Sequence, residues 1–183
     1  MTYPVFSAGE VLGAADMNAV GLWLVKTQTF SAATNCDVTG VFSADYENYV
    51  AVVRVAASLT GQYTNLQLLN GTTPKAVNYN RTNFVATSGA VLAIDSNATA
   101  TTAWRLCGQS ATAQFTTVSF YRPFTSATTG YHAQSSYTTP SNFQFYTAAG
   151  EQTENYSATG FRIYADGNAA TYTGTVRVYG YRN

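Results

Sequence analysis

The change from helix-like to strand-like sequence falls at Leu22-Trp23-Leu24-Val25-Lys26-Thr27-Gln28-Thr29-Phe30. Successive side chains of a strand point to opposite faces, so Trp23 and Val25 share one face and the two leucines share the other. Both faces are apolar where the stretch begins. We therefore expect this first strand to be covered on both sides at its start.

The residues before this strand predict a short helical segment. Ser7 and Glu10 have the spacing of a capping box, and Gly21 supplies a helix stop. A piece of this length is too short to be stable alone and needs a partner surface. We therefore expect residues 1–21 to be an N-terminal anchor that docks on a larger assembly, and residues 22–183 to form a β-sandwich domain.

Short strand-like runs separated by turn residues fill the rest of the chain. Beyond the first strand, they cover residues 48–56, 63–69, 76–84, 90–95, 102–108, 114–122, 131–138, 143–147, 160–165 and 172–182. Asn70-Gly71 is a hairpin signal. About ten short strands predict an all-β fold, an antiparallel jelly-roll-like β-sandwich preceded by the short N-terminal helix or anchor.

The composition favours association with other proteins. Charged residues make up 10% of the chain, and the formal net charge is zero. An average soluble domain has about 25% charged residues. This composition gives no electrostatic basis for binding nucleic acid, and the apolar run 20–25 is too short for membrane insertion. Low charge and strand edges that need protection predict a homotrimer.

Cysteine and histidine give no sign of a cofactor or metal. Cys36 and Cys107 are interpreted as small buried hydrophobes, although a disulfide between them stays open. His132 is the single histidine, so the usual zinc ligand set is missing, and we interpret it as a surface or strand-edge residue. Four triplets match the glycosylation pattern and are interpreted as chance matches: Asn70-Gly71-Thr72, Asn80-Arg81-Thr82, Asn97-Ala98-Thr99 and Asn155-Tyr156-Ser157.

The carboxylates offer little for catalysis. Glu151 and Glu154 form the one close pair that a glycosidase would need, but they lie in a glycine-containing stretch that we interpret as a solvated turn. Asp37, Asp45 and Glu47 have the oxygen ligands that calcium prefers, but their spacing matches no known calcium loop. We interpret these three as turn residues and expect no enzyme activity.

Four segments resemble phage virion structural proteins of the tail-fibre and minor tail type. They are Ala8-Gly9-Glu10-Val11-Leu12-Gly13-Ala14-Ala15-Asp16-Met17-Asn18, residues 21–29, Tyr46-Glu47-Asn48-Tyr49 and residues 173–183. The family's leader commonly reads Leu-Thr-Ala-Ala-Asp-Met-Asn, and Gly13 stands here in place of its threonine. The resemblance implies a β-sandwich on the virion, assembled in the host cytoplasm and often trimeric, with no catalytic residues.

These observations together predict a non-enzymatic tail fibre or minor tail protein that binds a host receptor. The expected docking residues are Glu10, Val11, Leu12, Ala15, Asp16, Met17 and Asn18. The expected contacts to a host surface glycan are exposed side chains of Tyr131, Gln134, Tyr137 and Gln144. Two alternatives stay open: a capsid decoration protein or head fibre, and a polysaccharide depolymerase that uses Glu151 and Glu154.

Overall fold

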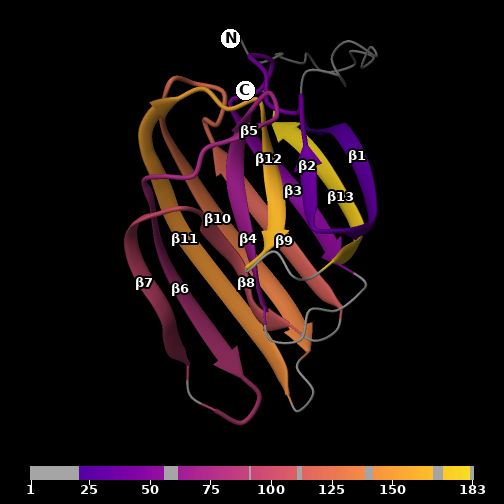
Figure 1. The fold of residues 1–183 in the computed structure, drawn as a ribbon, viewed down its shortest axis with the longest axis vertical. Helices are drawn as coiled ribbons and strands as arrows, with labels where there is room; N and C mark the ends of the chain where they lie inside the picture. The colour runs from indigo at the N-terminus through magenta and orange to yellow at the C-terminus, as the bar shows by residue number, and fades with distance from the viewer. Residues whose placement is uncertain are drawn as a thin grey trace, which may run out of the picture.

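Two antiparallel β-sheets pack face to face in the computed structural model (Figure 1). The structure describes residues 21–55, 62–90, 92–110, 113–138, 142–166 and 171–181, and within these ranges every regular element is a strand. The predicted antiparallel, jelly-roll-like β-sandwich is therefore confirmed. The predicted helix and all seven predicted docking residues, Glu10, Val11, Leu12, Ala15, Asp16, Met17 and Asn18, lie outside the described residues.

Thirteen strands make up the described part of the sandwich. They are β1 (Leu22–Ala33), β2 (Asn35–Val38), β3 (Asn48–Val55), β4 (Gln62–Asn70), β5 (Thr73–Pro74), β6 (Tyr79–Thr87), β7 (Ala93–Thr101), β8 (Trp104–Ser110), β9 (Gln114–Tyr121), β10 (Ala127–Thr138), β11 (Phe143–Tyr156), β12 (Gly160–Ala165) and β13 (Tyr172–Tyr181). One sheet has eight strands in the order β1-β13-β3-β9-β10-β11-β6-β7. The other has five, with β2-β12-β4-β5 in order and β8 paired to β4.

Every predicted strand is present, and two short strands were missed. β2 lies in a region that the sequence predicts as turn, where it pairs with β12. β5 pairs with β4 across Asn70-Gly71, which confirms the predicted hairpin. Gly71 has a φ of 61°, a left-handed conformation that glycine adopts without steric cost.

Strand alternation builds the core between the sheets. In β13, Val176, Val178 and Gly180 are buried while Arg177 and Tyr181 are exposed, as the sequence predicts. Aromatic side chains fill much of the interior, because each removes a large apolar area from water.

The start of β1 differs from the prediction. Leu22 is 48% exposed and Leu24 is 57% exposed, so this strand is not covered on both faces. β1 is the edge strand of the eight-stranded sheet, and only its inner face meets the core, through Val25 and Phe30. A register shift between Leu24 and Lys26 accompanies this arrangement.

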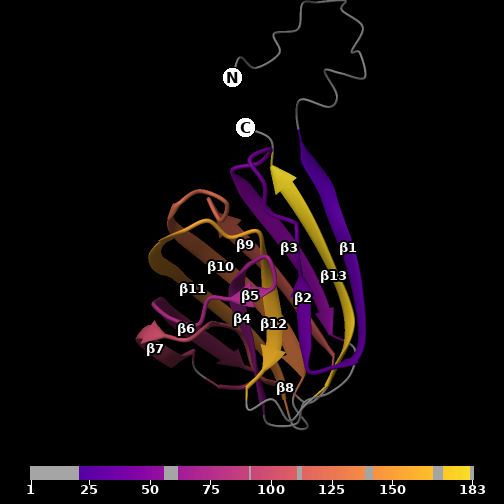
Figure 2. The ribbon, with the colours of Figure 1, turned by 45° about the horizontal axis from the view of Figure 1, so that its top comes forward.

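The two ends of the described chain lie at one end of the sandwich. Leu22 at the start of β1 pairs with Tyr181 at the end of β13, and Figure 2 shows the start of β1 and the end of β13 at the same, upper end of the sandwich.

Both cysteines are buried and neither forms a disulfide, which confirms their interpretation as small hydrophobes. Burial, with a smaller contribution from Asp37, raises the pKa of the Cys36 thiol to about 12. The thiol therefore stays protonated and unreactive at neutral pH.

Candidate functional site

The outer face of the eight-stranded sheet carries most of the exposed apolar surface in the described part of the chain. Strand register puts nine of the eleven large exposed hydrophobic residues on it: Leu22, Leu24, Val52, Ile94, Phe115, Tyr121, Phe143, Phe145 and Tyr181. Large exposed apolar patches are typical of interaction sites. This face is therefore the first candidate for a binding site.

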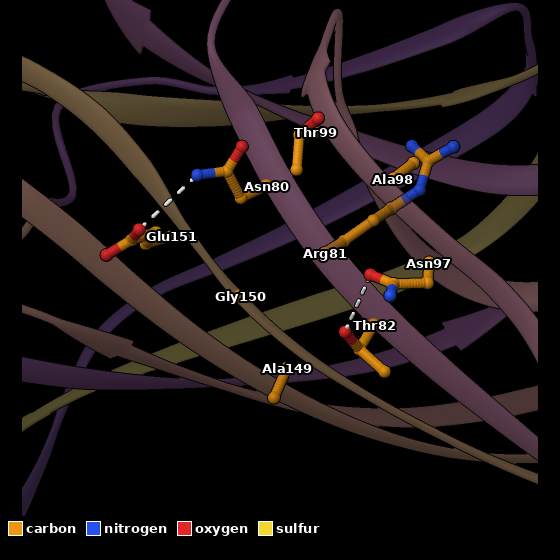
Figure 3. Close-up of a pocket in the computed structure, with 9 residues that line it drawn as sticks. All are labelled: Asn80, Arg81, Thr82, Asn97, Ala98, Thr99, Ala149, Gly150 and Glu151. Carbon is orange, nitrogen blue, oxygen red and sulfur yellow. Dashed lines mark hydrogen bonds between the residues drawn. The ribbon is translucent and has the colours of Figure 1, made fainter.

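A polar hollow opens at one corner of this face, where β6, β7 and β11 lie side by side (Figure 3). Its volume is about 300 Å3. The residues that line it are Asn80, Arg81, Thr82, Asn97, Ala98, Thr99, Ala149, Gly150 and Glu151. Amide, hydroxyl and carboxylate groups thus surround a floor of small residues.

Strand periodicity explains how the polar side chains converge. Asn80 and Thr82 are two residues apart in β6, as are Asn97 and Thr99 in β7, so each pair projects to one face. The register sets Thr82 opposite Asn97. Next to this pair the register shifts, and Ala100 takes a positive φ of 52°, which is uncommon for a residue other than glycine.

Hydrogen bonds fix these side chains. The Ala100 N–H donates to Asn80 Oδ1 at 3.1 Å, and Asn80 Nδ2 donates to Glu151 Oε1 at 3.3 Å. Thr82 Oγ1 donates to Asn97 Oδ1 at 3.2 Å. These contacts leave hydrogen-bonding capacity on the second carboxylate oxygen of Glu151 and on the side-chain N–H groups of Asn97.

An exposed aromatic ring lies beside the hollow. Gly130 in β10 pairs with Tyr121 on one side and with Glu151 on the other. A Cβ atom at Gly130 would lie 3.4 Å from Tyr121 Cδ2, so the tyrosine ring covers this glycine. Tyr121 is 47% exposed. The absence of a side chain at Gly130 thus allows the Tyr121 ring to lie over the position next to Glu151 in the sheet.

The guanidinium of Arg81 points away from the hollow. Its Nη1 donates to the Ala103 carbonyl oxygen at 2.5 Å, toward the five-stranded sheet. Burial lowers the pKa of Arg81, and the nearby Arg105 adds to this effect. Glu151 is therefore the charged group that the lining presents to solvent.

The structure corrects the predicted glycan contacts. Tyr131 and Tyr137 are each 2% exposed and belong to the core, because alternation in β10 turns them inward. Gln144 belongs to the set of alternate residues that face the inner side of β11, and its Nε2 donates a hydrogen bond to Thr87 Oγ1 at 3.1 Å. Gln134 alone of the four is exposed on the outer face. The four side chains therefore do not form one surface.

Two motifs that the sequence singled out for another reason line the hollow. Asn80-Arg81-Thr82 and Asn97-Ala98-Thr99 match the glycosylation pattern, and in strands the same spacing puts asparagine and threonine on one face. This repeated Asn-X-Thr pattern is the feature of the sequence from which the residues of the hollow could have been identified. Tyr121 had no comparable signal, because its position depends on the register of the β9–β10 pair and on which face of that pair is the outer one.

The sequence predicts a turn at Glu151 and Glu154, but both residues lie within strand β11. Residues three apart in a strand point to opposite faces. Glu151 contacts Asn80, whereas Glu154 forms an ion pair with Lys75 and accepts a bond from Asn78 Nδ2 at 2.7 Å. The two carboxylates therefore do not face each other across a cleft, as a glycosidase would require.

The Lys75–Glu154 ion pair predicts an acid-dependent stability difference. The Lys75 hydrogen bond is the largest cause that lowers the pKa of Glu154 from its usual 4.5, and Asn78 adds to it. A lowered folded-state pKa stabilises the fold above pH 4.5, and this contribution disappears as the pH falls through the lowered value. We expect Glu154→Gln to lower the melting temperature slightly at neutral pH and not in strong acid.

Melting curves of wild type and Glu154→Gln across this pH range measure the effect. Lys75→Met is the matched variant, because it removes the other partner and should show the same pH dependence. A difference between wild type and Glu154→Gln that stays constant from neutral pH to strong acid would contradict the assignment.

The remaining candidate ligands have structural roles. The sequence predicts a turn at Asp37, but this residue lies in β2. Its carboxylate accepts two hydrogen bonds from Arg162, at 2.6 and 2.8 Å. Asp45 does lie in a turn, where it accepts from Ser43 Oγ at 3.0 Å. Among the described residues, no three His, Cys, Asp or Glu side chains gather in a group that could hold a metal.

His132 lies on the outer face of β10, half-buried, with Nε2 3.3 Å from Thr147 Oγ1. β10 is a central strand of the sheet, so the interpretation of His132 as a strand-edge residue is wrong.

No described helix is long and apolar enough to cross a membrane.

Comparison with known proteins yields a structural similarity. No family model matches the chain, and no curated protein matches it. The chain is similar to the crystal structure of galectin LEC-6 from Caenorhabditis elegans, with a TM-score of 0.37 and 10% sequence identity. The match covers 86% of this chain and 94% of the galectin chain.

Proposed function

We propose that this chain is a non-enzymatic structural protein of a phage virion that binds a glycan on the host surface. In this proposal it is a tail fibre or minor tail protein, docked through residues 1–21. The observation that carries the glycan-binding role is the polar hollow beside the Tyr121 ring. The four segments that resemble tail proteins support the virion role.

The chemistry of the hollow suits a saccharide. A sugar presents many hydroxyl groups, each a donor and an acceptor, together with ring faces made of C–H groups. Amide, hydroxyl and carboxylate side chains can bond those hydroxyls in both directions, as Asn97, Thr99 and Glu151 can here. The negative face of an aromatic ring attracts the slightly positive C–H groups, and Tyr121 offers such a face.

The position of the hollow is compatible with docking through the N-terminus. β1 and β6 are separated by six strand steps in the sheet order, or about 29 Å at the usual strand spacing. A partner bound near Leu22 would therefore leave the hollow open. Antibody labelling of purified particles tests the location: label at the tail supports the proposal, label on the head lattice supports a decoration protein, and unlabelled particles contradict both.

Self-association is part of the proposal. β1 is a long edge strand with exposed Leu22 and Leu24, and strand edges of this kind invite pairing or covering. We therefore propose a homotrimer in the assembled particle. Sedimentation of the full chain should give the mass of three copies, whereas a single copy at micromolar concentration would contradict it.

Glycan binding is tested on an array of bacterial surface glycans. We expect the full chain to bind at least one glycan class, and Asn80→Ala and Tyr121→Ala each to weaken that binding about tenfold or more, as removal of a central contact does. Thr29→Val is the matched control, because Thr29 is exposed on the same face at the opposite edge strand. Wild type that binds no glycan, or variants that bind as wild type does, would overturn the proposed site.

A further inference from the structure

A second depression lies on the same outer face, toward the other end of the strands. Its volume is about 250 Å3. The outward-facing residues that line it are Val52, Arg54, Phe115, Thr117, Gln134, Ser136 and Phe145. Phe115 is 53% exposed and Phe145 is 40% exposed, and Arg54 lies over the Phe115 ring with Cζ 5.9 Å from its centroid. We call this depression the aromatic groove.

The aromatic groove combines rings with hydrogen-bonding groups, as the hollow does together with Tyr121. Exposed aromatic side chains lie beside an amide, Gln134, and hydroxyls such as Ser136. Arg54 is the one charged residue among those that line it. A sugar uses both ring faces and hydrogen-bonding groups, so this mixture fits a saccharide.

One strand connects the two depressions. Glu151, Ala149, Thr147, Phe145 and Phe143 alternate along the outer face of β11. Ala149 lines the hollow and Phe145 lines the aromatic groove, four residues apart, which is about 14 Å along an antiparallel strand.

Small and polar side chains fill the distance between them. Thr147 lies midway and is bonded to His132 of the neighbouring strand β10. Ala149 pairs with His132, and Thr147 pairs with Gln134. The path from the hollow to the groove therefore offers hydroxyl, imidazole and amide groups.

We infer that the hollow and the aromatic groove are two subsites for one extended saccharide chain laid along β10 and β11. This inference rests on the proposed glycan-binding function and deepens it, because it names the ligand class as a linear polysaccharide. One sugar unit occupies the hollow beside Tyr121, and a unit further along the same chain stacks on Phe115 and Phe145.

The test is a length series of the polysaccharide that binds most tightly on the array, made by partial hydrolysis and separated by size. Calorimetry should give an affinity that rises with chain length and levels off once both subsites are filled. We expect a gain of about tenfold or more from the shortest to the longest chains, the size of one strong contact.

Variants separate the two subsites. Phe115→Ala and Phe145→Ala should weaken binding of long chains about tenfold and leave short chains unchanged, whereas Tyr121→Ala should weaken both. Leu92→Ala is the control, because Leu92 is 59% exposed outside both depressions and should change neither.

The outcomes distinguish this inference from the proposed function. Equal affinity for short and long chains, or equal losses for both in Phe115→Ala, would overturn the extended site and leave the hollow as a single-sugar site. A Phe115→Ala variant that changes the sedimenting mass while long chains bind as before would make the groove a contact between copies and overturn the inference. If no chain of any length binds, the proposed function itself fails.

Discussion

Replacing Trp104 with alanine is expected to lower the free energy of unfolding by about 3–5 kcal/mol. Trp104 is fully buried between the two sheets. Its ring stacks on Tyr131 with centroids 4.3 Å apart and meets Tyr79 edge-on at 5.0 Å. The substitution leaves a cavity where three aromatic rings meet, so it loses both apolar burial and ring contacts.

Urea unfolding measures this loss. Trp104→Phe should cost much less than Trp104→Ala, because Trp104 Nε1 has no hydrogen-bond partner within the described structure and phenylalanine keeps a ring in place. Leu92→Ala is the control for an exposed residue and should change stability by less than about 0.5 kcal/mol. A Trp104→Ala protein as stable as the Leu92→Ala protein would contradict the packing described.

Gly150→Ala should destabilise the sheet by about 1–3 kcal/mol or more and also weaken glycan binding. A Cβ atom at Gly150 would lie 2.0 Å from the Asn80 carbonyl oxygen and 2.9 Å from Arg81 Cα. Both are backbone atoms, so relief requires β6 to move away from β11. That movement separates Asn80 from Glu151 and changes the shape of the hollow.

Gly130→Ala is the matched stability control for Gly150→Ala. A Cβ atom at Gly130 meets Tyr121 Cδ2 at 3.4 Å, an ordinary van der Waals contact with a side chain, so the fold should tolerate it. Urea unfolding is measured on both variants, and array binding on Gly150→Ala alone. Equal stability of Gly150→Ala and wild type would mean that β6 and β11 are not as close as described.

Much of the fold could be predicted because strand alternation is a local property. The pattern of Val176, Arg177 and Val178 identifies a strand and its buried face without knowledge of its neighbours. The same holds for the hairpin at Asn70-Gly71. β2 was missed because Asn35–Val38 is only four residues long, and its pairing with β12 involves residues more than a hundred positions away.

The candidate site could not be predicted to the same degree, because it depends on which strands become neighbours. Tyr131 and Tyr137 were expected to be exposed, but alternation alone does not say which face of β10 is the core. Glu151 was assigned to a turn because Gly150 suggested a break, whereas this glycine permits close approach of β6. Only the pairings of β6, β7, β9, β10 and β11 bring the hollow and Tyr121 together.

Glycan binding in the hollow is tested most directly by a crystal structure of the full chain soaked with the glycan that binds most tightly on the array. The expected result is a sugar unit beside the Tyr121 ring, with hydroxyl groups bonded to Glu151 and Asn97. A sugar bound elsewhere on the molecule, such as on the outer face of the five-stranded sheet, with the hollow left empty, would contradict it.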